Sequence, residues 1–130
     1  MQINYFIHSC ENIIKLNLNV LGDFEVQKKM WFSSEQQKWT FSDAVEHFLE
    51  NCLDLFDTRE YIQLKDEKAC LTLMKLYSNT RRYYGNINSL KATNSERELF
   101  SNSDWIEIKN LAIQTKIELT KLLTRLKNER

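Results

Sequence analysis

Proline is absent from the 130-residue chain, and glycine occurs only at Gly22 and Gly85. An average composition would supply roughly six prolines and nine glycines. This scarcity excludes phosphate-binding loops, dinucleotide-binding fingerprints and nucleophile elbows, because each needs glycines at fixed spacing. It also disfavours a sandwich or barrel with many tight turns, and no apolar run approaches the ~20 residues of a membrane-spanning helix. These absences leave a mostly helical globular domain.

The overall amino-acid composition is typical of a single folded domain. Hydrophobic residues make up 42% of the chain and charged residues 28%, with 18 Lys and Arg balancing 18 Asp and Glu. Such a chain is too apolar for disorder and long enough to build one core. Its first residues lack the basic segment and the cleavage site of a signal peptide. The three cysteines, Cys10, Cys52 and Cys70, fall on apolar helical positions, which predicts reduced, buried thiols in a cytoplasmic protein.

Apolar residues recur at steps of three and four along most of the chain, which predicts an all-α fold: an irregular bundle of four or five helices in one domain. Residues 12–21 also alternate between polar and apolar as a short strand would, so the sequence leaves helix and strand open there. The segment 24–39 is expected to divide into two short helices, the second starting at Ser33 or Ser34. The expected helices cover residues 3–21, 24–39, 43–57, 66–84 and 104–127.

Local signals predict where these helices begin and end. Gly22 and Gly85 are expected stops, and Ser42 and Ser103 are expected N-caps. Thr58 or Asp66 is expected to cap the helix that precedes Gly85. The polar residues 86–95 predict a loop, followed by a short turn over 97–100. In the last helix three isoleucines widen the apolar face, so we expect several neighbours to cover it: Ile106, Ile113 and Ile117.

A row of acidic residues is the most distinctive charge pattern. Its five members are spaced three, four, four and three apart, so they share an arc of roughly 80° on one helix, opposite the apolar face. The row contains none of the Glu–Lys pairs that usually stabilise an exposed helix face. It is either a solvated face or a docking edge for a basic partner. We call these residues the acidic stripe: Asp43, Glu46, Glu50, Asp54 and Asp57.

Two tryptophans, Trp31 and Trp39, precede the acidic stripe in a segment rich in aromatic residues. Aromatic side chains in a small domain belong to the core by default. An exposed tryptophan beside the stripe would instead supply an apolar anchor with a charged rim, which suits protein recognition. The aromatic residues could equally be buried between copies of the chain, so a homo-oligomer remains an open alternative.

A second candidate surface contains Arg81, Arg82, Tyr83 and Tyr84, in which aromatic and basic residues could contact RNA bases and phosphates. The segment from Arg81 to Asn86 resembles the loop of HEPN ribonucleases, in which a helical bundle presents an arginine, a polar residue and a histidine. This resemblance implies at most an inactive relative, because the chain has no histidine there to act as a general base. The balanced charge and the pI near 6.7 disfavour nucleic acid as a partner.

No residue set predicts catalysis, a cofactor or a metal. His47 lies beside Glu46 and near Cys52, but zinc-site spacings are absent, and a site would need His8 or Cys10 from another helix. General acid–base catalysis by a carboxylate pair needs one carboxylate that is desolvated and has a raised pKa. The acidic stripe lies opposite the apolar face, so its carboxylates should be hydrated.

The sequence therefore predicts a small non-catalytic protein that binds a basic protein partner through the acidic stripe. Such a protein could inhibit a toxin by blocking its active site, as immunity proteins and antitoxins do. An RNA-binding or degraded nuclease-like bundle that uses Arg81 to Tyr84 is the alternative.

Overall fold

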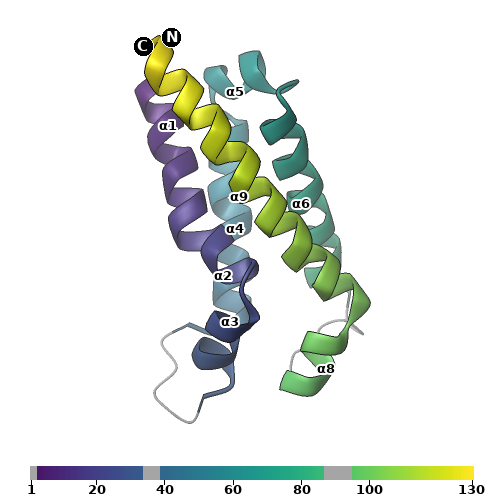
Figure 1. Cartoon of the computed structure of the whole chain (residues 1–130). Helices are drawn as coiled ribbons and strands as arrows, with labels where there is room; N and C mark the ends of the chain where they lie inside the picture. Colours follow the sequence, from purple (N-terminus) through teal and green to yellow (C-terminus); the bar gives the residue numbers. More distant parts are fainter. Residues whose placement is uncertain (1–2, 34–38, 87–94) are drawn as a thin grey trace.

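Helices make up all the regular structure that the computed structural model describes, which covers residues 3–33, 39–86 and 95–130 (Figure 1). The predicted all-α class and single domain are confirmed, and residues 12–21 are helical. The elements are α1 (Ile3–Asn12), the π-helix η1 (Ile13–Leu18), α2 (Asn19–Leu21), α3 (Phe24–Trp31), α4 (Phe41–Phe56), α5 (Arg59–Leu64), α6 (Lys68–Tyr84), α8 (Glu96–Ser101) and α9 (Ser103–Glu129).

The long helix α9 organises the bundle. It contains 27 residues, which corresponds to about 40 Å of helix. In Figure 1 it crosses the front of the bundle diagonally, with α1 on one side, α6 on the other and α4 behind, and the two chain ends lie close together. The contact between α6 and α9 is the most extensive between two helices. Because α4 packs against α1, η1 and α6, its remaining face is free to point outward.

Two predicted N-caps were wrong by a few residues. Thr40, not Ser42, precedes α4: its hydroxyl accepts from the Asp43 backbone N–H, and the Asp43 carboxylate accepts from the Thr40 backbone N–H. Asn102, not Ser103, caps α9. In both places the residue with extended backbone geometry comes before the predicted serine, so the serine is already helical.

The predicted stops at Gly22 and Gly85 are confirmed, because these residues directly follow α2 and α6. The predicted cap of the helix before Gly85 was wrong: Thr58 caps the separate helix α5, and α6 starts after Glu67, whose side chain makes no capping hydrogen bond. The short turn predicted over 97–100 is helix α8. The second short helix predicted in 24–39 and the loop predicted over 86–95 lie mainly outside the described residues, but α3 ends at Trp31 and Trp39 is not helical.

An aromatic cluster around Trp105 fills one end of the core. The Trp105 ring is fully buried, and its centroid lies 5.0 Å from that of Phe41 and 5.2 Å from that of Tyr83. Its indole N–H donates to Gln27 Oε1 at 2.9 Å, and Gln27 Nε2 donates to the backbone carbonyls of Val20 and Leu21. The buried amide thus connects α9, α3 and the end of α2 without leaving its own polar atoms unpaired.

The three cysteines are buried free thiols, as the sequence predicted. Burial raises the pKa of Cys10 and of Cys52 well above the usual range, and it raises the pKa of Cys70 to about 12. These thiols are therefore neutral in the folded protein throughout the ordinary pH range.

The thiols should make folding stability sensitive to alkaline pH. A raised folded-state pKa contributes stability that is complete below the unfolded pKa and is lost as the pH rises above it. We expect the free energy of unfolding to be constant between about pH 7 and 8, then to fall by about 1.4 kcal/mol per pH unit for each thiol. Urea denaturation at a series of pH values measures this, and a Cys52→Ala variant should show a shallower decline. An unfolding free energy that stays flat up to about pH 10.5 would contradict the assignment.

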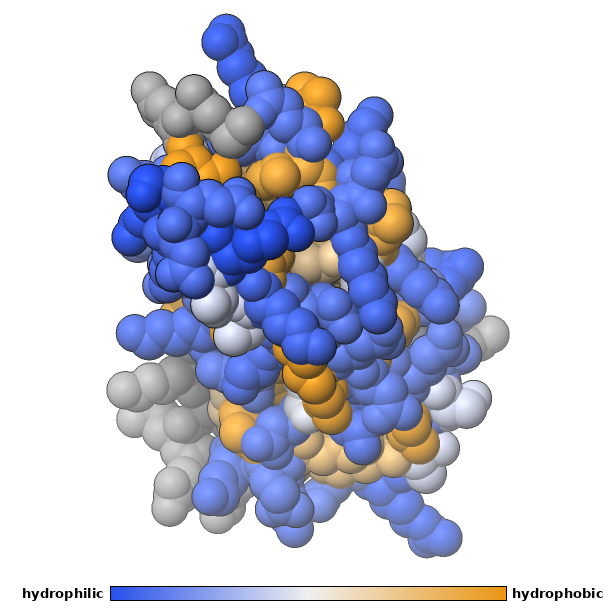
Figure 2. All heavy atoms as spheres, turned by 45° about the horizontal axis from the view of Figure 1, so that its top comes forward, coloured by the Kyte–Doolittle hydropathy of each residue, from blue (hydrophilic) through white to orange (hydrophobic). Residues whose placement is uncertain are grey.

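One expectation about α9 was wrong. Ile113 and Ile117 were expected to be covered by neighbouring helices, yet they are 44% and 50% exposed. Hydrophilic side chains dominate the face shown in Figure 2, where apolar atoms occupy several separate places between them. The two isoleucines border a groove that is described below.

Candidate functional site

Helix α4 presents the acidic stripe to solvent. All five of its carboxylate side chains are exposed, because the buried residues of α4 occupy the opposite side of the helix. Six residues form that buried side: Phe41, Ala44, Val45, Phe48, Cys52 and Leu55. The sequence prediction that the stripe faces water is consistent with this geometry.

Two members of the stripe have partners within the molecule. Asp43 completes the N-terminal cap with Thr40, where its negative charge also opposes the positive end of the helix dipole. Glu46 accepts a hydrogen bond of 2.6 Å from the hydroxyl of Tyr84, which ties α4 to the end of α6. This hydrogen bond raises the pKa of Tyr84. Asp43 and Glu46 therefore stabilise the fold, in addition to any role in binding.

The other three members, Glu50, Asp54 and Asp57, differ from the first two. Among residues 3–33, 39–86 and 95–130, none of these three side chains has a hydrogen-bond partner or a cation within 4.0 Å. Asp54 lies in the last turn of α4 and Asp57 directly follows it, and that turn has no basic residue. Negative charge is unfavourable at this end of a helix because the dipole places partial negative charge there. The positions of Asp54 and Asp57 therefore lower the free energy of unfolding, and no contact with the described residues offsets this effect.

An exposed leucine lies beside these carboxylates. Leu53, a hydrophobic residue of α4, is 53% exposed. At 100° per residue it falls roughly 60° from the centre of the acidic stripe and much farther from the centre of the buried face. The helical angle could have identified it from sequence, whereas its hydrophobicity alone pointed to the core.

On the other flank of the stripe, a polar network joins α4 to the π-helix η1. Asn17, which is buried, places its Nδ2 3.0 Å from His47 Nδ1, and Asn51 Nδ2 donates to Asn17 Oδ1 at 3.0 Å. Because Asn17 accepts from Asn51, its own N–H faces His47, and the neutral imidazole then has its proton on Nε2. Trp39 packs edge-on against the His47 ring, with centroids 5.0 Å apart. The network therefore fixes the side chain on which Trp39 rests.

The two tryptophans have different environments. Trp39 is 39% exposed and lies next to α4, whereas Trp31 is 6% exposed and contacts Phe41 and Trp105. Trp31 is thus a core residue, so of the two tryptophans considered as an apolar anchor beside the stripe, Trp39 is the exposed one. Leu53 and Trp39 are the apolar side chains that flank the acidic stripe.

The arrangement of Arg81, Arg82, Tyr83 and Tyr84 does not form the predicted RNA-contacting cluster. Tyr83 is 4% exposed in the aromatic core, where burial and then the charge of Asp104 raise its pKa to about 12. Tyr84 donates to Glu46, and Arg82 donates to Asn79 Oδ1 at 2.6 Å. The two arginines are exposed, whereas Tyr83 is buried and Tyr84 is half-buried, with its hydroxyl bound to Glu46, so the four side chains do not present one continuous surface for stacking and phosphate contact.

Within the described ranges, no group of three His, Cys, Asp or Glu side chains is placed to hold a metal ion. No helix in those ranges is both long and apolar enough to cross a membrane. Comparisons with protein-family models, curated proteins and solved structures find no match to this chain.

Proposed function

We propose that the protein is a non-catalytic cytoplasmic binding protein whose acidic stripe docks onto a basic protein surface. The observation that supports this most is the set of three carboxylates without a partner among the described residues, Glu50, Asp54 and Asp57, of which the last two lie at the end of α4, where negative charge is unfavourable. A basic protein bound at this surface would place positive charges beside these carboxylates and make their interactions favourable.

The surroundings of the stripe suit protein recognition. A single-sign row of charges speeds the encounter with an oppositely charged surface and orients it. Leu53 and Trp39 on the two flanks supply apolar area that can be buried once the charges have aligned. Leu53 projects from α4, and Trp39, which precedes the helix, packs edge-on against the His47 ring. Side chains that are already positioned in this way lose little freedom when they bind.

Inhibition is the form of binding that we propose. A row of carboxylates along a helix can bind the cationic groups with which an enzyme recognises an anionic substrate. The enzyme cannot cleave these carboxylates, so the bound protein blocks its active site. The protein would then act stoichiometrically, as immunity proteins and antitoxins do towards toxins. The RNA-binding alternative has less support, because Tyr83 is buried and Tyr84 is engaged with Glu46.

Affinity capture with matched charge variants tests the proposal. The immobilised protein is incubated with lysate of the source organism at low and at moderate salt, and bound proteins are identified by mass spectrometry. We expect the wild-type protein to retain a basic protein that the variant Glu50→Lys/Asp54→Lys/Asp57→Lys does not. Retention should fall by at least about 100-fold, because three attractive contacts become repulsive.

A control variant with the same net charge separates the stripe from general electrostatics. Glu25→Lys/Asp66→Lys/Glu98→Lys reverses three exposed carboxylates that lie outside α4 and have no ion pair in the described residues. It should retain the same protein, as should Arg81→Ala/Arg82→Ala. Equal loss in the control and the stripe variant, or loss only in the arginine variant, would overturn the proposal.

A further inference from the structure

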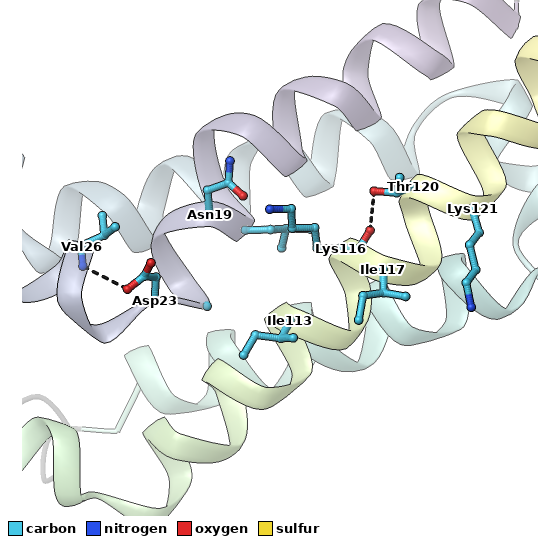
Figure 3. A pocket seen from close by; sticks show the side chains of 10 residues that line it. Asn19, Asp23, Val26, Ile113, Lys116, Ile117, Thr120 and Lys121 are labelled. Atoms are coloured by element: carbon cyan, nitrogen blue, oxygen red, sulfur yellow. Dashed lines mark hydrogen bonds between the residues drawn. The ribbon is translucent and has the colours of Figure 1, made fainter.

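A groove separates α9 from the N-terminal helices. It has a volume of about 800 Å³ and runs between the η1–α2–α3 segment and α9. That volume lies within the range of small-molecule sites, roughly 300–1,000 Å³. The side chains that border it project from both walls, as Figure 3 shows. The apolar part of the lining consists of Leu18, Val26, Ile113 and Ile117.

Gly22 lets the wall of the groove formed by the turn after α2 pack closely against Ile113. A Cβ atom at this position would lie 3.2 Å from Ile113 Cγ1 and 3.0 Å from the Leu18 carbonyl oxygen. The turn between α2 and α3 therefore approaches α9 closely, and Ile113 and Ile117 remain half exposed along the groove instead of being covered. Two half-exposed isoleucines one turn apart are an apolar surface that lacks a partner within the described residues.

The charge available in the groove is positive. Lys116 and Lys121 line it, and neither has a carboxylate within 4.0 Å among the residues that the structure describes. In Figure 3 Lys116 extends from α9 toward Asn19 of α2. The one acidic group in the lining, Asp23, already accepts from the backbone N–H groups of Glu25 and Val26 as the cap of α3.

Other cations on α9 are occupied, which makes these two lysines distinctive. Arg125 pairs with Glu67, Lys127 pairs with Glu11, and Lys109 lies 4.7 Å above the centroid of the Phe24 ring. Unpaired ammonium groups therefore coincide with exposed apolar side chains at the groove. This coincidence specifies both parts of a ligand: an apolar body and an anionic head.

We propose that the groove binds an amphiphilic anion, a saturated alkyl chain with a terminal carboxylate. Its chain would lie along the exposed sides of Ile113 and Ile117, and its carboxylate would meet Lys116, with the charge of Lys121 adding to the positive potential of the groove. The site shares no residue with the acidic stripe on α4, so this inference and the proposed function stand or fall independently.

Decanoate is the probe for this site, and decyltrimethylammonium, which has the same tail length and the opposite charge, is its control. Isothermal titration calorimetry, with the isoleucine methyl resonances recorded in parallel, should detect decanoate binding at Ile113 and Ile117. We expect the cationic amphiphile to bind at least about tenfold more weakly and acetate not to bind. Equal affinity for the two amphiphiles would overturn the proposal. So would the absence of decanoate binding up to about 5 mM, a concentration that corresponds to a binding free energy near −3 kcal/mol.

Two variants separate the apolar and ionic parts of the site. Ile113→Gln/Ile117→Gln should weaken decanoate binding at least about tenfold, because the loss of apolar contact removes transfer free energy from the tail. Both side chains are half exposed, so the variant should fold normally, and its thermal unfolding checks this. Ile62→Gln on α5, at a position that is 61% exposed, is the matched control and should bind decanoate as the wild type does.

Lys116→Gln/Lys121→Gln should lower the affinity for decanoate about fivefold and should abolish the preference over decyltrimethylammonium. Lys75→Gln, an exposed lysine on α6, should change neither. If the lysine variant keeps the full preference for the anion, or if an amphipathic peptide shifts the same methyl resonances while decanoate does not, the groove is not a site for an alkyl carboxylate.

Discussion

Replacing Trp105 with alanine should lower the free energy of unfolding by about 4–6 kcal/mol, as measured by urea denaturation followed by far-UV circular dichroism. The fully buried ring contacts Phe41, Tyr83 and Trp31, so its removal leaves a large cavity in the aromatic cluster. It also leaves Gln27 Oε1 without the indole donor. Small domains have about 5–15 kcal/mol of stability in total, so this variant should be close to unfolding at room temperature.

A Trp105→Phe variant separates the two contributions. Phenylalanine retains most of the ring volume but cannot donate to Gln27, so we expect a loss of about 1–3 kcal/mol. Gln27 would keep its donations to the carbonyls of Val20 and Leu21. If Trp105→Ala lowers the free energy of unfolding by less than about 2 kcal/mol, the Trp105 ring and its hydrogen bond to Gln27 do not hold α9 against α3.

Reversing the three unpaired carboxylates of the stripe should make the protein more stable. We expect Glu50→Lys/Asp54→Lys/Asp57→Lys to raise the free energy of unfolding by about 1–2 kcal/mol. Asp54 and Asp57 lie at the end of α4, where the dipole favours cations, and a lysine at position 50 would lie one turn from Glu46, so a like-charge pair becomes an attractive one. Thermal unfolding should move upward by about 3–8 °C.

The control variant should respond in the opposite direction. Glu25 and Glu98 lie in the first turns of α3 and α8, where negative charge is favourable, so their reversal should lower stability. Greater stability together with lost binding is the pattern expected when residues are kept for function at the expense of folding. A stripe variant that is less stable than the wild type would mean that these carboxylates have stabilising contacts within the molecule.

The sequence predicted the helices well because their signals are local. The apolar residues of α9 recur with helical spacing, and glycines mark the ends of α2 and α6. The caps at Thr40 and Asn102 were missed because a serine two residues or one residue later has the same capping chemistry. The choice between such neighbours depends on where the backbone leaves the extended region, which no single residue type determines.

The sequence predicted the charged residues of the candidate site, but it did not predict which apolar side chains lie beside them. The exposure of the acidic stripe follows from helical spacing, whereas the burial of Trp31 and the exposure of Trp39 depend on the packing of α3 and α9 around Phe41. The contact between Asn17 and His47 depends on the π-helix, whose wider turn changes which side chain faces α4. A sequence pattern read at 3.6 residues per turn cannot reveal such a change.

An NMR titration of the labelled protein with its captured, purified partner tests the central claim most directly. The indole N–H of Trp39 should shift on binding along with the backbone amides around Glu50, Asp54 and Asp57, while the buried indoles of the other two tryptophans should not move. Shifts concentrated at Arg81 and Arg82, or along α9, with the α4 signals unchanged, would contradict the account.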